Sequence, residues 1–245
     1  MNNFLLDIGN SCIKTGVGKH NSSEISLVKR FYYSKDTFEK DFIKNFPDIK
    51  NKYFSGAGIS IQSKSCHNFL GAFFKKRYNI NPVFITRDMK LPVKINYSEG
   101  IGTDRICNAA AADALYKKKN ILIIDFGTAT TFTLVSDSIL SGGLISPGLK
   151  TSLDSLLKNT NLPEVKISAP AKLITRDTIN NIKAGVFFQC LYSVQRVIKE
   201  VKREYRNLFV VSTGGFSEII SSELKEINII DRNLTLKGIN IILTQ

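Results

Sequence analysis

The stretch DFGTATTFTL, residues 125–134, decides the fold because a similar stretch occurs near the start of the chain. It follows the apolar run NILII, and DIGNSCIKTG, residues 7–16, follows the apolar run FLL. In both, an aspartate ends an expected buried strand, and a glycine and small polar residues come after it. The pattern Asp-x-Gly-(Asn/Thr)-(Ser/Ala) thus stands once near the start of each half, which indicates a duplicated architecture.

The rest of each half follows the same plan, in which strands around the Asp-x-Gly turn are followed by alternating helices and strands. Expected strands cover 3–9, 12–18, 24–34, 52–58 and 82–86, then 120–127, 130–137, 138–146 and 207–215. Expected helices cover 36–46 (N-cap Asp36 or Thr37), 63–79 and 103–119, then 150–159, 175–205 and 216–225. This order predicts an α/β protein with two domains, 1–116 and 117–245, that meet at a cleft.

The net charge of +13 is spread along the chain. Residues 1–116 carry 17 Lys/Arg and 10 Asp/Glu, a net charge of +7, and the remainder has a net charge of +6. There is no basic tail, so a nucleic-acid partner is not expected, and an anionic small substrate also fits the charge.

Neither a membrane span nor a signal peptide is expected from the sequence. No apolar run approaches the roughly 20 residues that cross a bilayer, and the first residues do not read as a signal peptide. The four cysteines are scattered, without metal-binding spacing, so reduced thiols in a cytoplasmic protein are expected. His20 and His67 stand alone in polar stretches and are not expected to be catalytic.

Both Asp-x-Gly turns have features of a phosphate site. Glycine lets backbone N–H groups approach an anion, and Lys14 adds positive charge. A carboxylate next to phosphate needs a cation between them, so Asp7 and Asp125 suggest metal sites. For a single motif of this kind, a plain turn with an Asx hydrogen bond is the better explanation, but two matching copies in matching halves favour a functional role. Further donors are available from Asn10, Ser11, Thr128, Thr130 and Thr131.

Three other glycine-rich stretches stand out. In GIGTDRICNAAAA, residues 100–112, Thr103 or Asp104 would cap a helix, and Arg105 in the first turn suggests an anionic ligand unless it is simply solvated. The stretches SGGLISPGL, 141–149, and STGG, 212–215, would line a pocket or serve only as turns.

Taken together, these motifs resemble those of the type III pantothenate kinases, of the acetate and sugar kinase/heat-shock protein 70/actin superfamily. DIGNSCIKTG is similar to the first phosphate motif of that family, GTDR (102–105) to its G-x-D-R motif, and DFGTATTF to its second phosphate motif. TGG (213–215) and LTLKGI (234–239) match its C-terminal pattern. The resemblance implies duplicated ribonuclease H-like (actin-like ATPase) domains with mixed sheets flanked by helices.

The resemblance also implies a reaction, the ATP-dependent phosphorylation of pantothenate to 4'-phosphopantothenate, with Asp104 as general base. Asp125 would bind a monovalent cation (K⁺ or NH₄⁺), and Mg²⁺ would bind with the ATP phosphates. The protein would be a homodimer, with the apolar stripe of helix 178–205 as a natural dimer surface. ATP would contact Asp7, Ile8, Gly9, Asn10, Ser11, Cys12, Ile13, Lys14 and Thr128, and pantothenate would contact Tyr97, Gly102, Thr103, Asp104, Arg105 and Thr178.

The chain departs from the family pattern in two places. Only SEGI separates Tyr97 from Gly102, and SGAGISIQS (55–63) replaces a Ser-Val-(Val)-Pro segment, with no role that the sequence assigns. Two alternatives remain: a kinase for another small metabolite or sugar, and a non-catalytic accessory factor for transcription.

Overall fold

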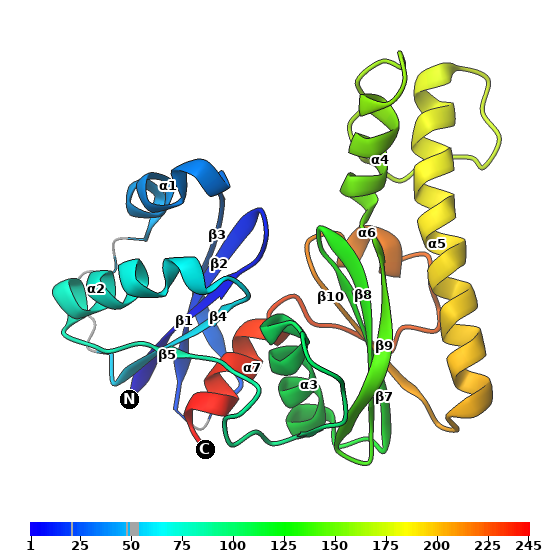
Figure 1. Ribbon diagram of the computed structural model, residues 1–245. Helices are drawn as coiled ribbons and strands as arrows, with labels where there is room; N and C mark the ends of the chain where they lie inside the picture. The colour runs from blue at the N-terminus through cyan, green and yellow to red at the C-terminus, as the bar shows by residue number, and fades with distance from the viewer. Residues whose placement is uncertain (21, 48, 50–53) are drawn as a thin grey trace. The chain divides into compact units, whose positions relative to one another are not determined.

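The computed structural model describes residues 1–20, 22–47, 49 and 54–245 and divides into two compact units (Figure 1). The first unit contains residues 1–117, 138–140 and 233–245, and the second contains 118–137 and 141–232. Within the described part of the chain, none of the helices combines the length and apolar character needed to cross a bilayer.

The first unit is built on a five-stranded sheet with the order β3-β2-β1-β4-β5. Strands β1, β2 and β3 are antiparallel neighbours, whereas β4 is parallel to β1 and β5 is parallel to β4. The strands are β1 (Asn2–Ile8), β2 (Cys12–Lys19), β3 (Ile25–Tyr32), β4 (Gly56–Ile61) and β5 (Val83–Phe84). A short β6 (Lys94–Ile95) pairs with the start of β9 (Ile139–Pro147).

Alternation along β1 gives this sheet two different faces. Phe4, Leu6 and Ile8 are buried in a cluster rich in phenylalanine with α1 (Phe38–Asn45) and α2 (His67–Tyr78). The residues between them point to the opposite face, because successive side chains of a strand alternate. On that face lie α3 (Thr103–Tyr116) and α7 (Leu234–Leu243), which run side by side (Figure 1). Asp7 therefore faces the helix that carries Asp104.

The two helices α3 and α7 cross at very close range. A Cβ on Gly238 would overlap the backbone carbonyl of Cys107 and lie 2.9 Å from its Cα. Next to this crossing, Thr235 Oγ1 donates a hydrogen bond to Asn108 Oδ1 over 2.8 Å, and both side chains are buried. The C-terminal helix is thus an integral part of the first unit.

The second unit, like the first, begins with an antiparallel hairpin followed by helices and further strands. Strand order is β11-β10-β7-β8-β9, with β7 and β8 antiparallel and β10 parallel to β7. The elements are β7 (Asn120–Phe126), β8 (Ala129–Ser136), α4 (Leu149–Lys158), α5 (Thr178–Glu204), β10 (Phe209–Thr213), α6 (Ser217–Ser221) and β11 (Ile229–Ile230). The fold class expected from the sequence, mixed sheets flanked by helices in a duplicated plan, is confirmed.

Several expected elements differ in extent. Helix 36–46 begins only at Phe38 after a 3₁₀ turn (Lys35–Thr37), and helix 63–79 begins at His67 after another (Lys64–Cys66). Helix 216–225 shortens to the five residues of α6. Helix 103–119 ends at Tyr116 because Lys117 adopts a left-handed conformation, with φ of 49°. The first two residues of the strand expected at 52–58 lie outside the described residues.

The apolar stripe of α5 is not a surface, contrary to its expected role in a dimer. Ile182, Val194 and Ile198 are buried in the core of their own unit, and Cys190, Val197 and Val201 pack against that core. Burial of this stripe on the sheet and α4 stabilises the unit itself. Any dimer contact by α5 must therefore use its outer face.

Candidate active site

The first group of site residues surrounds the β1–β2 turn. The turn spans residues 9–11, and the Gly9 N–H donates to the Cys12 carbonyl over 3.0 Å. Asp7 is paired in register with Lys14 on β2 and with Ser60 on β4. Lys14 is 9% exposed, so its side chain is largely shielded from bulk water. The hairpin thus offers backbone donors and a positive charge at one place.

A tyrosine that comes directly after strand β3 holds this turn in place. The Tyr33 hydroxyl donates to the Gly9 carbonyl over 2.6 Å, and the Tyr33 N–H donates to the Ser11 carbonyl over 3.4 Å. Because a trans peptide is planar, fixing the carbonyl of Gly9 points the N–H of Asn10 the opposite way. Tyr33 therefore controls the orientation of a donor that the sequence assigns to phosphate.

The start of α3 is fastened to the end of β4. The hydroxyls of Ser60 and Thr103 share a hydrogen bond of 3.0 Å, and the Thr103 N–H donates to Gln62 Oε1 over 3.4 Å. Ser60 and Gln62 belong to the stretch 55–63, to which the sequence assigned no role. The alternation of polar Ser60 and Gln62 with buried Ile59 and Ile61 was the signal that could have indicated them.

Asp104 lies in the first turn of α3 and is half-buried. Its Oδ1 accepts the N–H of Arg105 over 2.8 Å, and Oδ2 has no partner among the described residues. Cys107, one turn further on, relates this carboxylate to Asp7: burial raises the pKa of the Cys107 thiol well above its ordinary value, and the charges of Asp7 and Asp104 raise it further. Both carboxylates therefore lie near the same buried thiol, and Asp104 has one oxygen available for a proton.

Tyr97 joins the same group despite the short stretch between it and Gly102. The Arg105 guanidinium donates to the Tyr97 hydroxyl over 3.3 Å, and its carbon lies 5.0 Å from the centroid of the tyrosine ring. Arg105 is 3% exposed, so it is held inside the unit and is not a solvated surface charge. Of the two interpretations of Arg105, the plainly solvated one is excluded.

The second group of site residues surrounds the β7–β8 turn. The Gly127 N–H donates to the Ala129 carbonyl over 3.1 Å, which leaves Thr128 exposed at the tip. Thr128 accepts two hydrogen bonds at its carbonyl, from the Gly148 N–H over 3.0 Å and from Thr151 Oγ1 over 2.5 Å. The stretch 141–149 therefore packs against this turn.

Asp125 is covered on one side by backbone. It pairs in register with Thr213 on β10, and Gly214 follows with φ of 95°. A Cβ on Gly214 would lie 2.5 Å from Asp125 Oδ1 and 2.6 Å from the backbone of Phe126. Only glycine permits both this conformation and this approach. The stretch 212–215 thus packs directly against the residues that lead into the β7–β8 turn.

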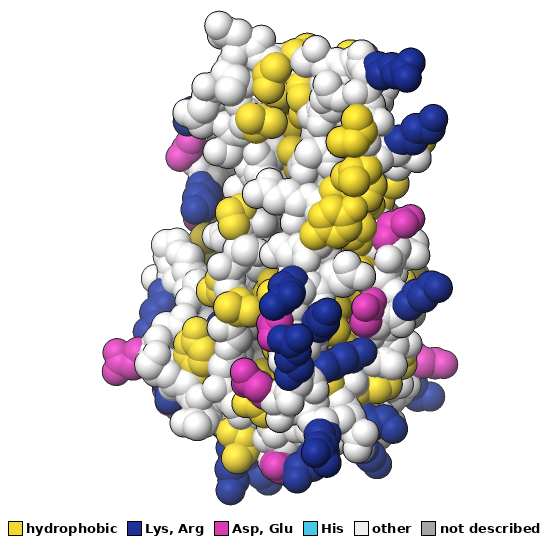
Figure 2. All heavy atoms as spheres, turned by 90° about the vertical axis from the view of Figure 1, so that its right-hand side faces the viewer, with side chains coloured by type: hydrophobic (Ala, Val, Ile, Leu, Met, Phe, Trp, Pro, Cys, Tyr) yellow, Lys and Arg dark blue, Asp and Glu magenta, His cyan; other side chains and the backbone are white. Residues whose placement is uncertain are grey.

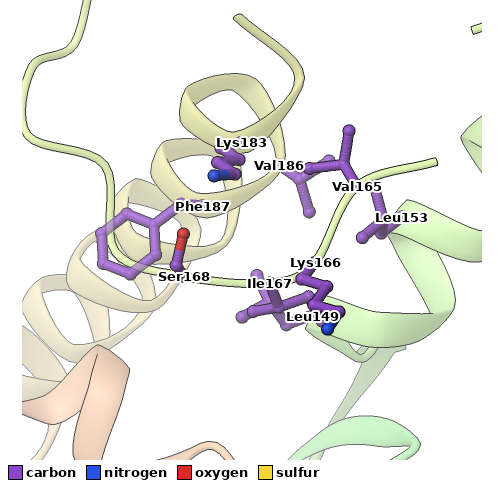
Figure 3. Close-up of a pocket in the computed structure, with 9 residues that line it drawn as sticks. All are labelled: Leu149, Leu153, Val165, Lys166, Ile167, Ser168, Lys183, Val186 and Phe187. Atoms are coloured by element: carbon purple, nitrogen blue, oxygen red, sulfur yellow. The ribbon is translucent and has the colours of Figure 1, made fainter. Parts of the chain in front are cut away.

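Thr178 lies apart from the second turn, at the first position of α5. It lines a groove of about 430 Å³ between α4 and α5, together with Asn181, Gly185 and Gln189. A second cavity, lined by Leu149, Val186 and Phe187 among others, is shown in Figure 3. Its volume of about 10 Å³ is at the limit for one water molecule, so it is no substrate site.

Two hairpins of this kind, each opening a mixed sheet flanked by helices, are the architecture of the duplicated ribonuclease H-like (actin-like ATPase) fold. Two solved structures share the fold along the whole chain. One is a conserved putative Baf family transcriptional activator from Campylobacter jejuni (TM-score 0.58, 21% identity, 98% of this chain and 96% of that one). The other is a putative N-acetylmannosamine kinase from Listeria monocytogenes (TM-score 0.53, 13% identity, 99% of each chain).

Sequence comparison narrows this class to one family. The family model described as type III pantothenate kinase matches residues 3–200. A type III pantothenate kinase from Fusobacterium nucleatum is 34% identical over 245 residues, covering 96% of this chain and 95% of that protein. Another from Petrotoga mobilis is 34% identical over 247 residues, covering 96% and 95%. The chain belongs to the type III pantothenate kinase family.

Proposed function

We propose that this protein transfers the γ-phosphate of ATP to pantothenate, giving 4'-phosphopantothenate in the first step of coenzyme A biosynthesis. The observation that carries the proposal is the family match over residues 3–200. The fold supports it, since both phosphate turns and the G-x-D-R helix start are present and locally well formed. Use of ATP follows from the kinase family itself.

Asp104 is the proposed general base. The hydroxyl oxygen of pantothenate forms a bond to the γ-phosphorus, the bond between that phosphorus and the ADP oxygen breaks, and the hydroxyl proton passes to Asp104. Phosphoryl transfer requires mainly positioning and charge neutralisation, so one well-placed carboxylate is sufficient for the proton. The free Oδ2 of Asp104 and its attachment through Thr103 to Ser60 support this role.

The residues present can hold a metal ion only if phosphate oxygens of the nucleotide complete its set of ligands. Among the described residues no three His, Cys, Asp or Glu side chains come together as a metal site. Mg²⁺ in kinases takes one or two carboxylates and completes its shell with phosphate oxygens and water, so Asp7 is a suitable single ligand. Asp125 is proposed to hold a monovalent cation. When bound, these ions would neutralise phosphate charge.

The predicted site residues are proposed to divide between the two substrates, pantothenate and ATP. Arg105 and Tyr97, which already bind each other, are proposed to contact pantothenate together with Gly102 and Thr103. The β1–β2 turn, residues 7–14, and Thr128 are proposed to contact ATP. Thr178 is proposed to contact pantothenate through the groove of α4 and α5. A cytoplasmic location is proposed because the four cysteines are all free thiols.

A homodimer is the proposed assembly, formed through the outer face of α5. Ile179 and Tyr192 are 47% and 48% exposed, and Phe188 stacks on Tyr192 with ring centroids 5.5 Å apart. Figure 2, which views the α5 side, shows exposed hydrophobic side chains in its upper part and Lys and Arg side chains below them. A light-scattering mass equal to one chain, 27.4 kDa, would contradict the dimer.

The function is tested by an acceptor panel. Purified protein with ATP, Mg²⁺ and K⁺ should form ADP with pantothenate and not with N-acetylmannosamine or glucose. A sugar as the preferred acceptor would favour the alternative of a sugar kinase, and nucleotide binding without any transfer would favour the alternative of an accessory factor for transcription.

The cation proposed at Asp125 is tested in the same assay. Sodium in place of potassium should lower the rate by about tenfold or more if a cation at Asp125 neutralises phosphate charge. Equal rates would rule out that site.

The hydrogen bond from the Tyr33 hydroxyl to the β1–β2 turn leads to a further prediction. Tyr33→Phe removes the hydroxyl that holds the Gly9 carbonyl, so the Asn10 N–H loses its fixed direction. One hydrogen bond of about 1 kcal/mol corresponds to a rise of about fivefold in the KM for ATP, measured by steady-state kinetics. Tyr32→Phe is the matched control, because Tyr32 is 73% exposed and its hydroxyl makes no hydrogen bond within the described residues. Equal effects of the two substitutions would contradict this role of Tyr33.

A further inference from the structure

One row of polar side chains crosses the sheet of the first unit beside the β1–β2 turn. Ser60 on β4 is in register with Asp7 on β1, Asp7 with Lys14 on β2, and Lys14 with Arg30 on β3. Residues paired in this way point to the same face of a sheet. The row lies on the face opposite Leu6, Ile8 and Ile13, which are buried among the phenylalanines. Arg30 therefore shares the face of Asp7, Lys14 and α3.

A β-bulge is responsible for this position of Arg30. Near the far end of the hairpin Val17 pairs with Ser26, and continuing that register would place Lys29 opposite Lys14. The register shifts by one residue between Thr15 and Val17, and Leu27 adopts a left-handed φ of 51°. A bulge re-aims every side chain that follows it. As a result Phe31 turns toward the phenylalanine cluster, and Arg30 replaces Lys29 on the face with Lys14.

The guanidinium group of Arg30 is also available to bind a ligand. Arg30 is exposed, and its guanidinium has no hydrogen bond or ion pair among the described residues, whereas Arg196, Arg203 and Arg232 each pair with a glutamate. Its charge is felt at the turn itself: burial raises the pKa of the Cys12 thiol, and Arg30 opposes this rise more strongly than Lys14 does. Because Arg30 lies directly opposite Lys14 on the neighbouring strand, an anion bound beside them would meet two cations.

We propose that Arg30 binds the phosphates of ATP together with Lys14, an inference that rests on the proposed kinase function. The class of ligand is a nucleoside polyphosphate, because a planar guanidinium beside an ammonium group matches several phosphate oxygens at once. Arg30 thus extends the phosphate site from the turn of 7–14 onto the edge strand β3, outside the sequence motif.

The experiment is equilibrium binding of ATP, ADP and AMP by calorimetry, which uses no pantothenate. Arg30→Gln should weaken ATP binding by about tenfold, the scale of one lost charge-assisted contact, with a smaller effect on AMP. Lys29→Gln, which removes the same charge on the opposite face of β3, should change ATP affinity by less than about twofold. Equal losses in the two variants, or an unchanged affinity in Arg30→Gln, would overturn the proposal.

Thermal unfolding separates binding from folding. Without nucleotide, Arg30→Gln should melt close to the wild-type temperature, because the exposed guanidinium makes no hydrogen bond or ion pair within the described residues. With ATP, the rise in melting temperature should be smaller than in wild type. A lower melting temperature without nucleotide would assign Arg30 a structural role instead. If wild type binds ATP but does not phosphorylate pantothenate, the proposed function fails while the inference on Arg30 stands; if it binds no ATP, both fail.

Discussion

Replacing Asp104 with asparagine is expected to lower kcat by about 10²–10⁴-fold, the range usual for loss of a general base. Asparagine keeps the size of the side chain, and its Oδ1 can still accept the N–H of Arg105 that lies 2.8 Å from the aspartate oxygen. The start of α3 should therefore stay in place. What disappears is the carboxylate oxygen that would take the proton from the hydroxyl of pantothenate.

This prediction is checked by steady-state kinetics with both substrates. Because Asp104 is proposed to act only on the reacting hydroxyl, the KM for ATP should stay within about twofold of wild type. Asp113→Asn is the control, since Asp113 lies on the same helix two and a half turns further on. Equal kcat in wild type and Asp104→Asn would rule out the base, and a comparable loss in Asp113→Asn would attribute the effect to the helix.

Replacing Gly238 with alanine is expected to destabilise the first unit by about 3 kcal/mol or more, at the upper end of the cost of overpacking. The added Cβ would overlap the carbonyl of Cys107, and backbone cannot move aside as a flexible side chain can. Helices α3 and α7 would have to separate, and the buried bond between Thr235 and Asn108 would be stretched. Since α3 carries Asp104, the activity of the remaining folded protein should fall as well.

Gly71→Ala provides the matched comparison. Gly71 also lies inside a helix, α2, but a Cβ there meets nothing within 4 Å. Alanine should therefore stabilise the protein by about 0.5–1 kcal/mol through helix propensity and a less flexible unfolded chain. Thermal and urea unfolding of both variants measure the contrast. Similar stabilities for Gly238→Ala and Gly71→Ala would show that a side chain added at the crossing of α3 and α7 does not destabilise the protein.

The sequence predicts most of this fold because its strongest signals are local. An aspartate after an apolar run, followed by glycine, predicts both hairpins, and the alanine-rich run after Thr103 predicts α3. The family motifs then assign the two turns, Asp104 and Arg105 to one kinase site. These assignments of individual roles stay predictions, although the structure brings Tyr97, Thr103, Asp104 and Arg105 together locally.

Other features depend on packing between distant segments, which local patterns do not report. The stripe on α5 predicts burial but does not distinguish a partner chain from the sheet of its own unit. The final segment, 233–245, follows the second half in sequence yet packs with the first unit, where Gly238 meets Cys107. The place of Arg30 depends on a single-residue bulge, and alternation alone would have chosen Lys29.

The proposed kinase function is tested most directly by identifying the product of the reaction with ATP, Mg²⁺, K⁺ and pantothenate by mass spectrometry and phosphorus NMR. The predicted result is 4'-phosphopantothenate, phosphorylated on the primary hydroxyl and formed in equal amounts with ADP by wild type but only in traces by Asp104→Asn. ADP released without phosphopantothenate, or phosphate on another acceptor in preference to pantothenate, would contradict it.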